Sequence, residues 1–442
     1  MTALQFIEPL LFIVVTLVAI TMVTKRGKII LKTIQLGRSE EVKGPKMERW
    51  KNVLLLAFGQ QKMFRKPGVA LLHLIVYAGF IIINIEIVEI ILDGMLGQHR
   101  LFAPLLGSLY PTLINAFEML ALLVLVACIL FIIRRNLKSI PRLQSADLKG
   151  WPRNDAMIIL VTEIILMSLF LLMNASDTLL QERGHPSYSQ HATGNFWISA
   201  LLHPLLNNLT NDSLVVIERS SWWLHILGIY AFLNYLPYSK HLHIILAFPN
   251  AYFARLDPSG KMENMPSVQQ EVIYAMQPSL APVENSTTPA RFGARDVMDL
   301  TWKNLLDAYS CTECGRCSSA CPANQTGKLL SPRKIMMDTR DRLEELGKTL
   351  TKQGTWQEDG RSLLHTFISV EEINACTTCN ACVQECPVSI NPLDIILQLR
   401  RNLVMEESNT PAEWAALFGN VENNFAPWKF NPEDREKWIQ PS

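Results

Sequence analysis

The sequence predicts a mainly α-helical fold, in which a five-helix transmembrane bundle is joined to a cytoplasmic α-helical ferredoxin domain with two [4Fe–4S] clusters. One reason is that residues 1–248 contain five apolar stretches near the ~20 residues that a membrane-spanning helix needs. The other is a pair of cysteine runs in the last third of the chain. The mostly helical pattern of residues 322–375 separates these runs, where a minimal β-type ferredoxin would have a short connection.

The five predicted spans and the loops between them also predict an orientation. The spans are Leu4–Val23, Gly68–Leu92, Thr112–Ile133, Ala156–Asn174 and Ser221–Phe248. Segments 24–67 and 134–155 contain twelve and six Lys or Arg residues, whereas 94–111 and 176–213 contain one each. Since positive loops stay on the cytoplasmic side, we expect an outside N-terminus and a cytoplasmic segment 249–442 in a bacterial or archaeal inner membrane. The first span has no basic segment before it and no cleavage site, so we expect a retained helix.

Eight of the nine cysteines occur in two runs with the spacing C-x2-C-x2-C-x3-C-P. This is the bacterial ferredoxin spacing, in which the fourth cysteine of each run binds the other cluster. The predicted ligands are therefore Cys311, Cys314, Cys317 and Cys386 for cluster 1, and Cys376, Cys379, Cys382 and Cys321 for cluster 2. A zinc site would use two C-x2-C pairs with a longer spacer, and a disulfide framework would need an oxidising compartment. Both alternatives fit less well, and the ninth cysteine, Cys128, reads as packing in an apolar helix.

Four histidines in or beside the predicted spans are candidates for binding haem b or quinone, because ionisable residues in membrane helices are rare and often functional. They are His73, His225, His241 and His243. Two histidines on facing helices can hold a haem between them. His73 near the cytoplasmic face can meet His243, or His241 as the alternative. His225 and His243, five turns apart, are expected to share one helix face. The alternative is that the histidines are ordinary helix-end residues and that no haem binds.

The membrane part resembles the cytochrome b subunit of respiratory nitrate reductase in its five-helix layout and its His225/His243 spacing. In that family the second helix carries two histidines ten residues apart. Here His73 matches the cytoplasmic one, whereas Met63 and Ile83 occupy the positions ten residues away. The resemblance therefore implies one haem b more readily than two, and His225 could instead bind quinone.

The rest of the chain resembles the heterodisulfide reductase-like iron–sulfur oxidoreductases. The matching segments are Phe292–Arg295, Thr301–Lys303, the two cysteine runs, Thr326–Arg333 and Asn424–Trp428, and Trp222–Asn250 resembles the last membrane helix of fused members. In the family, a domain with paired-cysteine CCG motifs carries out catalysis. This sequence has no Cys-Cys pair, so the resemblance implies that the catalytic part is on a separate partner.

These observations predict a domain order and a function. We expect a cytochrome b-like membrane domain at 1–248, a linker at 249–300, a dicluster ferredoxin domain at 301–405 and a C-terminal extension at 406–442 that contacts a partner. The net charge of +1 indicates no nucleic-acid partner.

The predicted function is a membrane-bound electron-transfer subunit of a quinone oxidoreductase. It would relay electrons between the quinone pool and a cytoplasmic redox partner, which would be a CCG-type iron–sulfur subunit or a flavoprotein. The alternative is a membrane anchor or scaffold with structural or redox-sensing clusters and no haem.

Overall fold

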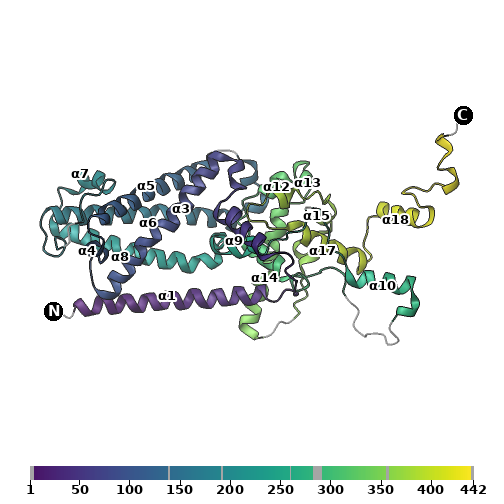
Figure 1. Ribbon diagram of the computed structural model, residues 1–442, viewed down its shortest axis with the longest axis horizontal. Coiled ribbons are helices and arrows are strands. Elements are labelled where there is room, and N and C mark those ends of the chain that lie inside the picture. The colour runs from purple at the N-terminus through teal and green to yellow at the C-terminus, as the bar shows by residue number, and fades with distance from the viewer. Residues whose placement is uncertain are drawn as a thin grey trace.

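The computed structural model describes residues 4–137, 140–190, 193–258, 260–281, 291–354 and 358–439. Within these residues the chain forms helices and no β-strand, as the sequence predicts. Long helices lie side by side at one end of the molecule, and the short helices of the cysteine-rich part are gathered at the other (Figure 1). Residues 259 and 282–290 of the predicted linker, and residues 440–442 of the predicted C-terminal extension, lie outside the described residues.

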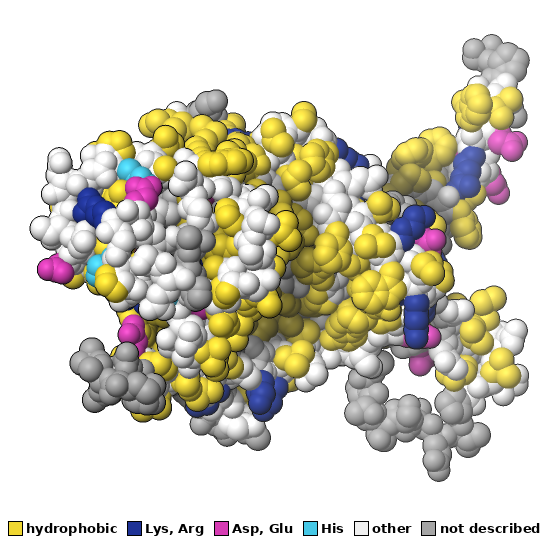
Figure 2. Space-filling view, turned by 60° about the vertical axis from the view of Figure 1, so that its left-hand side comes forward, with side chains coloured by type: hydrophobic (Ala, Val, Ile, Leu, Met, Phe, Trp, Pro, Cys, Tyr) yellow, Lys and Arg dark blue, Asp and Glu magenta, His cyan; other side chains and the backbone are white. Residues whose placement is uncertain are grey.

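Four helices are long and apolar enough, by length and composition, to cross a membrane. They are α1 (Leu4–Ile34), α3 (Pro67–Leu96), α5 (Leu109–Asn136) and α6 (Trp151–Glu182). Their outward side chains are largely leucine, isoleucine and valine, and few charged side chains interrupt the apolar surface in Figure 2. A fifth long helix, α8 (Asn211–Tyr235), packs against α6 and α1.

The predicted fifth span, Ser221–Phe248, is wrong as a continuous helix. Helix α8 ends at Tyr235, and two 3-10 turns, η6 (Leu236–Tyr238) and η7 (Lys240–Leu242), lead into α9 (His243–Tyr252). Pro237 has no N–H to donate and its ring clashes with the preceding turn. Asp155 then holds the turn in place, because it accepts hydrogen bonds from the Ser239 hydroxyl (2.6 Å) and the Lys240 amide (3.0 Å).

The bundle core is aromatic and closely packed. Phe12, Phe117, Phe170 and Trp222 are buried in one apolar cluster. Helices α3 and α5 approach closely at Gly79, where an added Cβ would lie 2.5 Å from Val124 Cγ2. Such small residues let the backbones of membrane helices come together.

Helix α1 extends well beyond its predicted end at Val23 and joins the two parts of the molecule. Ile30 and Ile34, in its last turns, belong to the buried core of the cysteine-rich part. The Thr33 hydroxyl lies 3.2 Å from the Tyr309 hydroxyl, and Arg26 pairs with Glu344. The membrane helices and the cysteine-rich part therefore share a packed interface.

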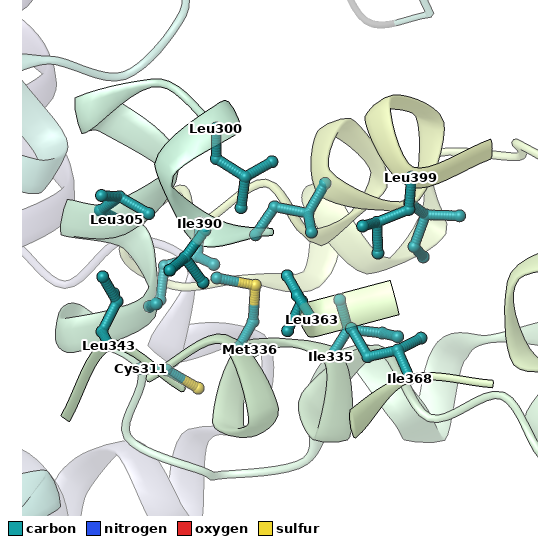
Figure 3. Close-up of a cluster of buried hydrophobic side chains, with 14 of the residues drawn as sticks. Leu300, Leu305, Cys311, Ile335, Met336, Leu343, Leu363, Ile368, Ile390 and Leu399 are labelled. Atoms are coloured by element: carbon teal, nitrogen blue, oxygen red, sulfur yellow. The ribbon is translucent and has the colours of Figure 1, made fainter. Parts of the chain in front are cut away.

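The cysteine-rich part is a set of helices around one apolar core (Figure 3). Its helices are α11 (Trp302–Ser310), α12 (Arg316–Ala320), α13 (Pro322–Gln325), α14 (Pro332–Gln353), α15 (Val370–Asn374), α16 (Ala381–Glu385) and α17 (Pro392–Met405). The predicted start of α14 is confirmed, because Ser331 caps it and Pro332 occupies its first position. Figure 3 shows Cys311 at the margin of the labelled core side chains.

The remaining elements are short. They are α2 (Lys46–Asn52), η1 (Val53–Phe58), η2 (Met63–Arg65), α4 (Phe102–Leu106), η3 (Pro141–Leu143), η4 (Ala146–Leu148), η5 (Ser199–Leu202), α7 (His203–Leu206), α10 (Pro266–Met276), η8 (Pro278–Leu280), η9 (Val297–Asp299), η10 (Leu363–Phe367), α18 (Ala412–Asn424), η11 (Pro432–Asp434) and η12 (Lys437–Ile439). Helix α18 extends away from the body in Figure 1 and has no buried side chain.

Candidate iron–sulfur and histidine site

The two cysteine runs fold in the same way. Glu313 and Thr378, which occupy matching positions, both have φ 56°, and the matching pair Gly315 and Asn380 have φ 71° and 62°. Left-handed backbone at non-glycine residues costs energy and is often found at functional sites. Each run then enters a short helix, α12 or α16, and these two helices pack together. The repeated geometry fits two loops that each wrap one cluster.

The structure brings the four thiols of each predicted set together. Cys311, Cys314, Cys317 and Cys386 line one small cavity of about 30 Å³. The thiol of Cys321 lies close enough to Cys376 and Cys382 for their charges to interact. The fourth cysteine of each run thus lies with the first three of the other, which is the arrangement that the spacing predicts. The ligand assignment itself stays a prediction.

In the described part of the chain, no group of three His, Cys, Asp or Glu side chains is arranged to hold a single metal ion. All nine cysteines are free of disulfide bonds.

Backbone amides and cationic side chains surround the thiols. The Ile390 amide donates to Cys386 Sγ (3.3 Å), and the Thr378 amide donates to Cys376 Sγ (3.4 Å). Burial raises the pKa of the Cys386 thiol to about 12, so bound iron must displace its proton. The Lys62 ammonium donates to the Cys386 carbonyl (3.1 Å). Such hydrogen bonds and charges are among the factors that set the potential of an iron–sulfur cluster.

The loop of the first cysteine run is also fixed by a buried carboxylate. Glu313 lies between Cys311 and Cys314, is 4% exposed, and pairs with Lys240 and with Arg340 (2.5 Å). Although burial pushes it upward, the pKa of Glu313 is held below its ordinary value by Arg340 and Lys240. Lys240 belongs to the turn after α8, so this ion pair ties the cysteine loop to the membrane part.

Three of the four candidate histidines lie together beside this loop. The rings of His241 and His243 are 5.6 Å apart and nearly perpendicular, and His73 lies close enough to both for their charges to interact. His73 Nδ1 lies 3.1 Å from Gln60 Oε1, and His243 Nδ1 lies 3.0 Å from the Lys240 carbonyl oxygen. A second partner at Nδ1 is how metal-binding histidines are usually oriented, with Nε2 left as the ligand atom.

His225 is separate from this group, contrary to the expectation that it shares a helix face with His243. It lies in α8, which ends before η7 and α9. The His225 ring is buried, lies 6.1 Å from the Phe170 ring, and its Nδ1 is 2.9 Å from the Leu166 carbonyl oxygen. Among the described residues, the histidines whose charges act on His73 and His241 are members of this group, and His225 is not one of them.

Residues that the sequence did not single out connect the histidines to cluster 1. Arg316, inside the first cysteine run, donates to the Lys62 carbonyl (3.0 Å), and its charge acts on His73. Gln60 and Lys62 belong to one short loop, which touches His73 at one residue and Cys386 at the other. The only signal in the sequence for Lys62 was its place in a basic loop, and Gln60 and Glu313 gave none.

Comparisons with known proteins agree with this geometry. Residues 310–390 match the model of the 4Fe-4S dicluster domain. The chain is 28% identical over 467 residues to the probable iron-sulfur-binding oxidoreductase FadF of Bacillus subtilis (strain 168), an alignment that covers 99% of this chain and 61% of the relative. It is 27% identical to the EtfAB:quinone oxidoreductase of Syntrophomonas wolfei subsp. wolfei, over 87% of this chain and 53% of the relative.

A third relative matches a smaller part. It belongs to the dihydromethanophenazine:CoB--CoM heterodisulfide reductase of Methanosarcina barkeri (strain Fusaro), and it is 29% identical over 33% of this chain and 36% of the relative. The chain spans about three fifths and about half the length of the first two relatives. No solved structure matches. The chain therefore contains a 4Fe–4S dicluster domain and four helices long and apolar enough to cross a membrane, and it is similar to iron–sulfur-binding oxidoreductases and to heterodisulfide reductases.

Proposed function

We propose that this protein is a membrane-bound electron-transfer subunit of a quinone oxidoreductase, which relays electrons between a cytoplasmic redox partner and the quinone pool. The observation that carries the proposal is the short loop at Gln60 and Lys62. It joins the cavity of cluster 1 to the histidine group through one hydrogen bond at each end. Two redox sites that exchange electrons must lie close together, and this loop puts their binding residues in contact.

Two [4Fe–4S] clusters would be held by the two sets of four cysteines. Bound there, each cluster accepts and releases single electrons at a potential set by its surroundings. The chain's own residues supply those surroundings. The Ile390 and Thr378 amides donate to the sulfurs, the Lys62 charge offsets the negative charge of the Cys386 thiolate, and Arg316 lines the same cavity.

One haem b would be held by His73 and His243, whose Nδ1 atoms already have partners and whose Nε2 atoms remain as ligands. His241, perpendicular to His243, is the alternative ligand. A haem bound there would supply a second one-electron site. His225 Nδ1 likewise has a carbonyl partner, Leu166, and the Phe170 ring lies beside the His225 ring. Because the positions ten residues from His73 hold Met63 and Ile83 and not a second histidine, quinone contact remains the proposal at His225.

The dicluster domain would face the cytoplasm. Both basic segments contact it, because Arg65 pairs with Glu385 (3.1 Å) and Asp147 pairs with Arg333 (2.6 Å). The positive-inside rule places such segments on the cytoplasmic side. In this arrangement the membrane part is 1–248, followed by the linker 249–300, the dicluster domain 301–405 and the extension 406–442.

The cytoplasmic partner would be a CCG-type iron–sulfur subunit or a flavoprotein. The Syntrophomonas relative is named EtfAB:quinone oxidoreductase. That name supports a protein partner at one end of the proposed relay and quinone at the other. The extension offers a contact surface, since Phe418, Val421, Trp428 and Trp438 are exposed apolar side chains on a segment whose helix α18 has no buried residue.

Spectroscopy of the purified full-length chain tests the proposal. We expect two dithionite-reducible [4Fe–4S] signals in electron paramagnetic resonance, with Cys386→Ser removing one signal and Cys321→Ser the other. We expect a b-type band in the reduced-minus-oxidised spectrum that His73→Ala removes. His203→Ala is the matched control, because the His203 ring contacts Thr178 (3.0 Å) and is not one of the candidate haem ligands.

A preparation with no reducible cluster signal would refute the relay. Clusters that quinol never reduces, together with no haem band, would instead leave an anchor or scaffold with redox-sensing clusters.

A further inference from the structure

A cavity of about 480 Å³ lies between the membrane helices and the dicluster domain, apart from the histidine group. We call it the interfacial cavity. Its membrane side is formed by α1, the start of α6 and the η6–η7 turn, and its other side by α11, the cysteine loop and α14. The lining includes Trp151, Tyr238 and Arg26. Aromatic and basic residues of this kind are enriched at the membrane–water interface, so we expect the cavity to lie at that depth.

One wall of the interfacial cavity is the loop that would hold cluster 1. Glu313, which separates Cys311 from Cys314, lines the cavity together with its two ion-pair partners, Lys240 and Arg340. The Arg340 guanidinium also lies close enough to the Cys311 thiol for their charges to interact. Whatever binds in this cavity is therefore adjacent to the cluster 1 loop.

The rest of the lining matches a flat ring with polar oxygens at its edge. Ile29, Trp151, Pro237 and Leu242 provide apolar contact. Lys240 and the Tyr309 hydroxyl line opposite sides of the cavity and are hydrogen-bond donors, with Glu313 and Glu344 as their present acceptors. Ligand sites are typically apolar cavities of about 300–1,000 Å³ with a few placed polar groups. Tyr238, which also lines the cavity, is 58% exposed.

We infer that the interfacial cavity binds the head group of a quinone, with the ring between the η6–η7 turn and α14 and the isoprenoid tail leaving toward the lipid. The inference rests on the proposed quinone oxidoreductase function and locates its substrate at the dicluster domain, whereas the sequence suggested a site near His225. Lys240 is common to both regions, since its carbonyl holds His243 and its ammonium faces Glu313.

The reaction at such a site balances as two electrons and two protons. Each quinone carbonyl oxygen would gain a proton to become a hydroxyl. The two electrons would be supplied one at a time by clusters held in the dicluster domain, which a cytoplasmic electron donor would reduce again. Carboxylates are placed to supply the protons. Asp155 and Glu344 line the cavity, and Asp341, whose side chain is 61% exposed, connects it to water. Quinol oxidation runs the same steps in reverse.

Photolabelling of the full-length chain in phosphatidylcholine nanodiscs tests the site directly. The probe is an azido-substituted naphthoquinone, competed with unlabelled menadione and mapped by mass spectrometry. We expect label in residues 237–242 and 340–351. Ile29→Trp, which fills the cavity from α1, should weaken labelling by about tenfold or more, equivalent to ~1.4 kcal/mol of binding. Ile20→Trp is the matched control, because Ile20 lies on the same helix and is 50% exposed.

A second measurement separates this inference from the proposed function. Stopped-flow reduction of the clusters by menadiol should need about tenfold more menadiol in Ile29→Trp, with cluster and haem spectra unchanged. Equal menadiol dependence in wild type and Ile29→Trp, with label elsewhere, would overturn the cavity and leave the function standing. No menadiol reduction in wild type would overturn both. Label displaced by phosphatidylglycerol but not by menadione would overturn the quinone assignment and give the cavity to a lipid head group.

Discussion

The ion pair between Asp147 and Arg333 should hold the dicluster domain against the membrane part. Arg333, in α14, is 1% exposed and grips Asp147 with two hydrogen bonds, Nε to Oδ2 at 3.0 Å and Nη2 to Oδ1 at 2.6 Å. It also donates to the Arg142 carbonyl (2.7 Å). Asp147 and Arg142 both belong to the 134–155 segment, so one guanidinium fastens this segment to the domain.

The substitution Asp147→Asn removes one charge with little change of shape. Removing one partner of a buried ion pair costs about 3–5 kcal/mol, because the other charge is left buried and unpaired. At about 1.4 kcal/mol per tenfold change, local opening of the 141–149 segment should become between about a hundredfold and a few thousandfold more frequent.

Hydrogen–deuterium exchange of the full-length chain in nanodiscs measures this opening. The Leu148 and Lys149 amides, which donate to the Ser145 and Ala146 carbonyls (3.1 Å each), are the reporters. The control is Glu345→Gln, which breaks the Arg361–Glu345 pair (2.8 Å) and a longer contact to Arg342 (3.5 Å), whose guanidinium keeps Asp296 and Asp359 as partners. The Arg361 and Glu345 side chains are 47% and 36% exposed, so the control should change exchange near residue 345 by less than about tenfold, within the 0–1 kcal/mol of surface pairs.

A result in which Asp147→Asn accelerates exchange no more than Glu345→Gln does would refute the reasoning. It would mean that the segment is held by apolar packing alone, with the buried pair contributing nothing net.

Further predictions concern pH and close packing. Burial pushes the pKa of Asp147 upward, but its hydrogen bonds to Arg333, Ser145 and Ser331 lower the pKa below its ordinary value. The contribution of Asp147 to stability is therefore complete above the ordinary pKa of about 3.9, and it is lost as the pH falls through the lower pKa of the folded state. Exchange of the segment should accelerate on acidification in wild type but not in Asp147→Asn. Gly79→Ala should lower thermal stability by about 1–3 kcal/mol through overpacking, and Val124→Ala in the same chain should restore it, since Val124 Cγ2 occupies that space. Gly315→Ala should lose iron and one cluster signal, because φ is +71° and an Arg333 guanidinium nitrogen occupies the space of an added Cβ. The control Gly327→Ala has φ +81° but open space around the added Cβ, so it should keep both clusters. Equal iron content in the two variants would contradict this prediction.

The candidate clusters were predictable from the sequence because their ligands obey short-range spacing. The C-x2-C-x2-C turn can wrap a cluster only with the backbone that Glu313 and Gly315 adopt, and the same turn recurs at Thr378 and Asn380. Four membrane helices were predictable for a similar reason, since their apolar length is a property of consecutive residues.

The error at Ser221–Phe248 has a physical cause that spacing does not reveal. Pro237 in an apolar stretch can kink a helix or end it, and the choice depends on whether the freed groups find partners. Asp155, on another helix, accepts from Ser239 and Lys240 (2.6 and 3.0 Å). That contact favours the turn, and the turn moves His243 off the helix that carries His225.

Local patterns of residues were enough to predict the helical class and the membrane helices, because periodicity and hydropathy involve neighbours in the chain. Motif spacing likewise supplies the two cysteine sets, which remain a prediction. The tertiary structure decided which distant groups meet. It brought Gln60 into hydrogen-bond contact with His73 and Lys62 with the Cys386 carbonyl, and it paired Lys240 with Glu313. Each pair joins segments that hydrophobic burial brings together. Such contacts depend on how α1, α3 and α6 pack against the dicluster domain, and no local pattern of residues encodes that packing.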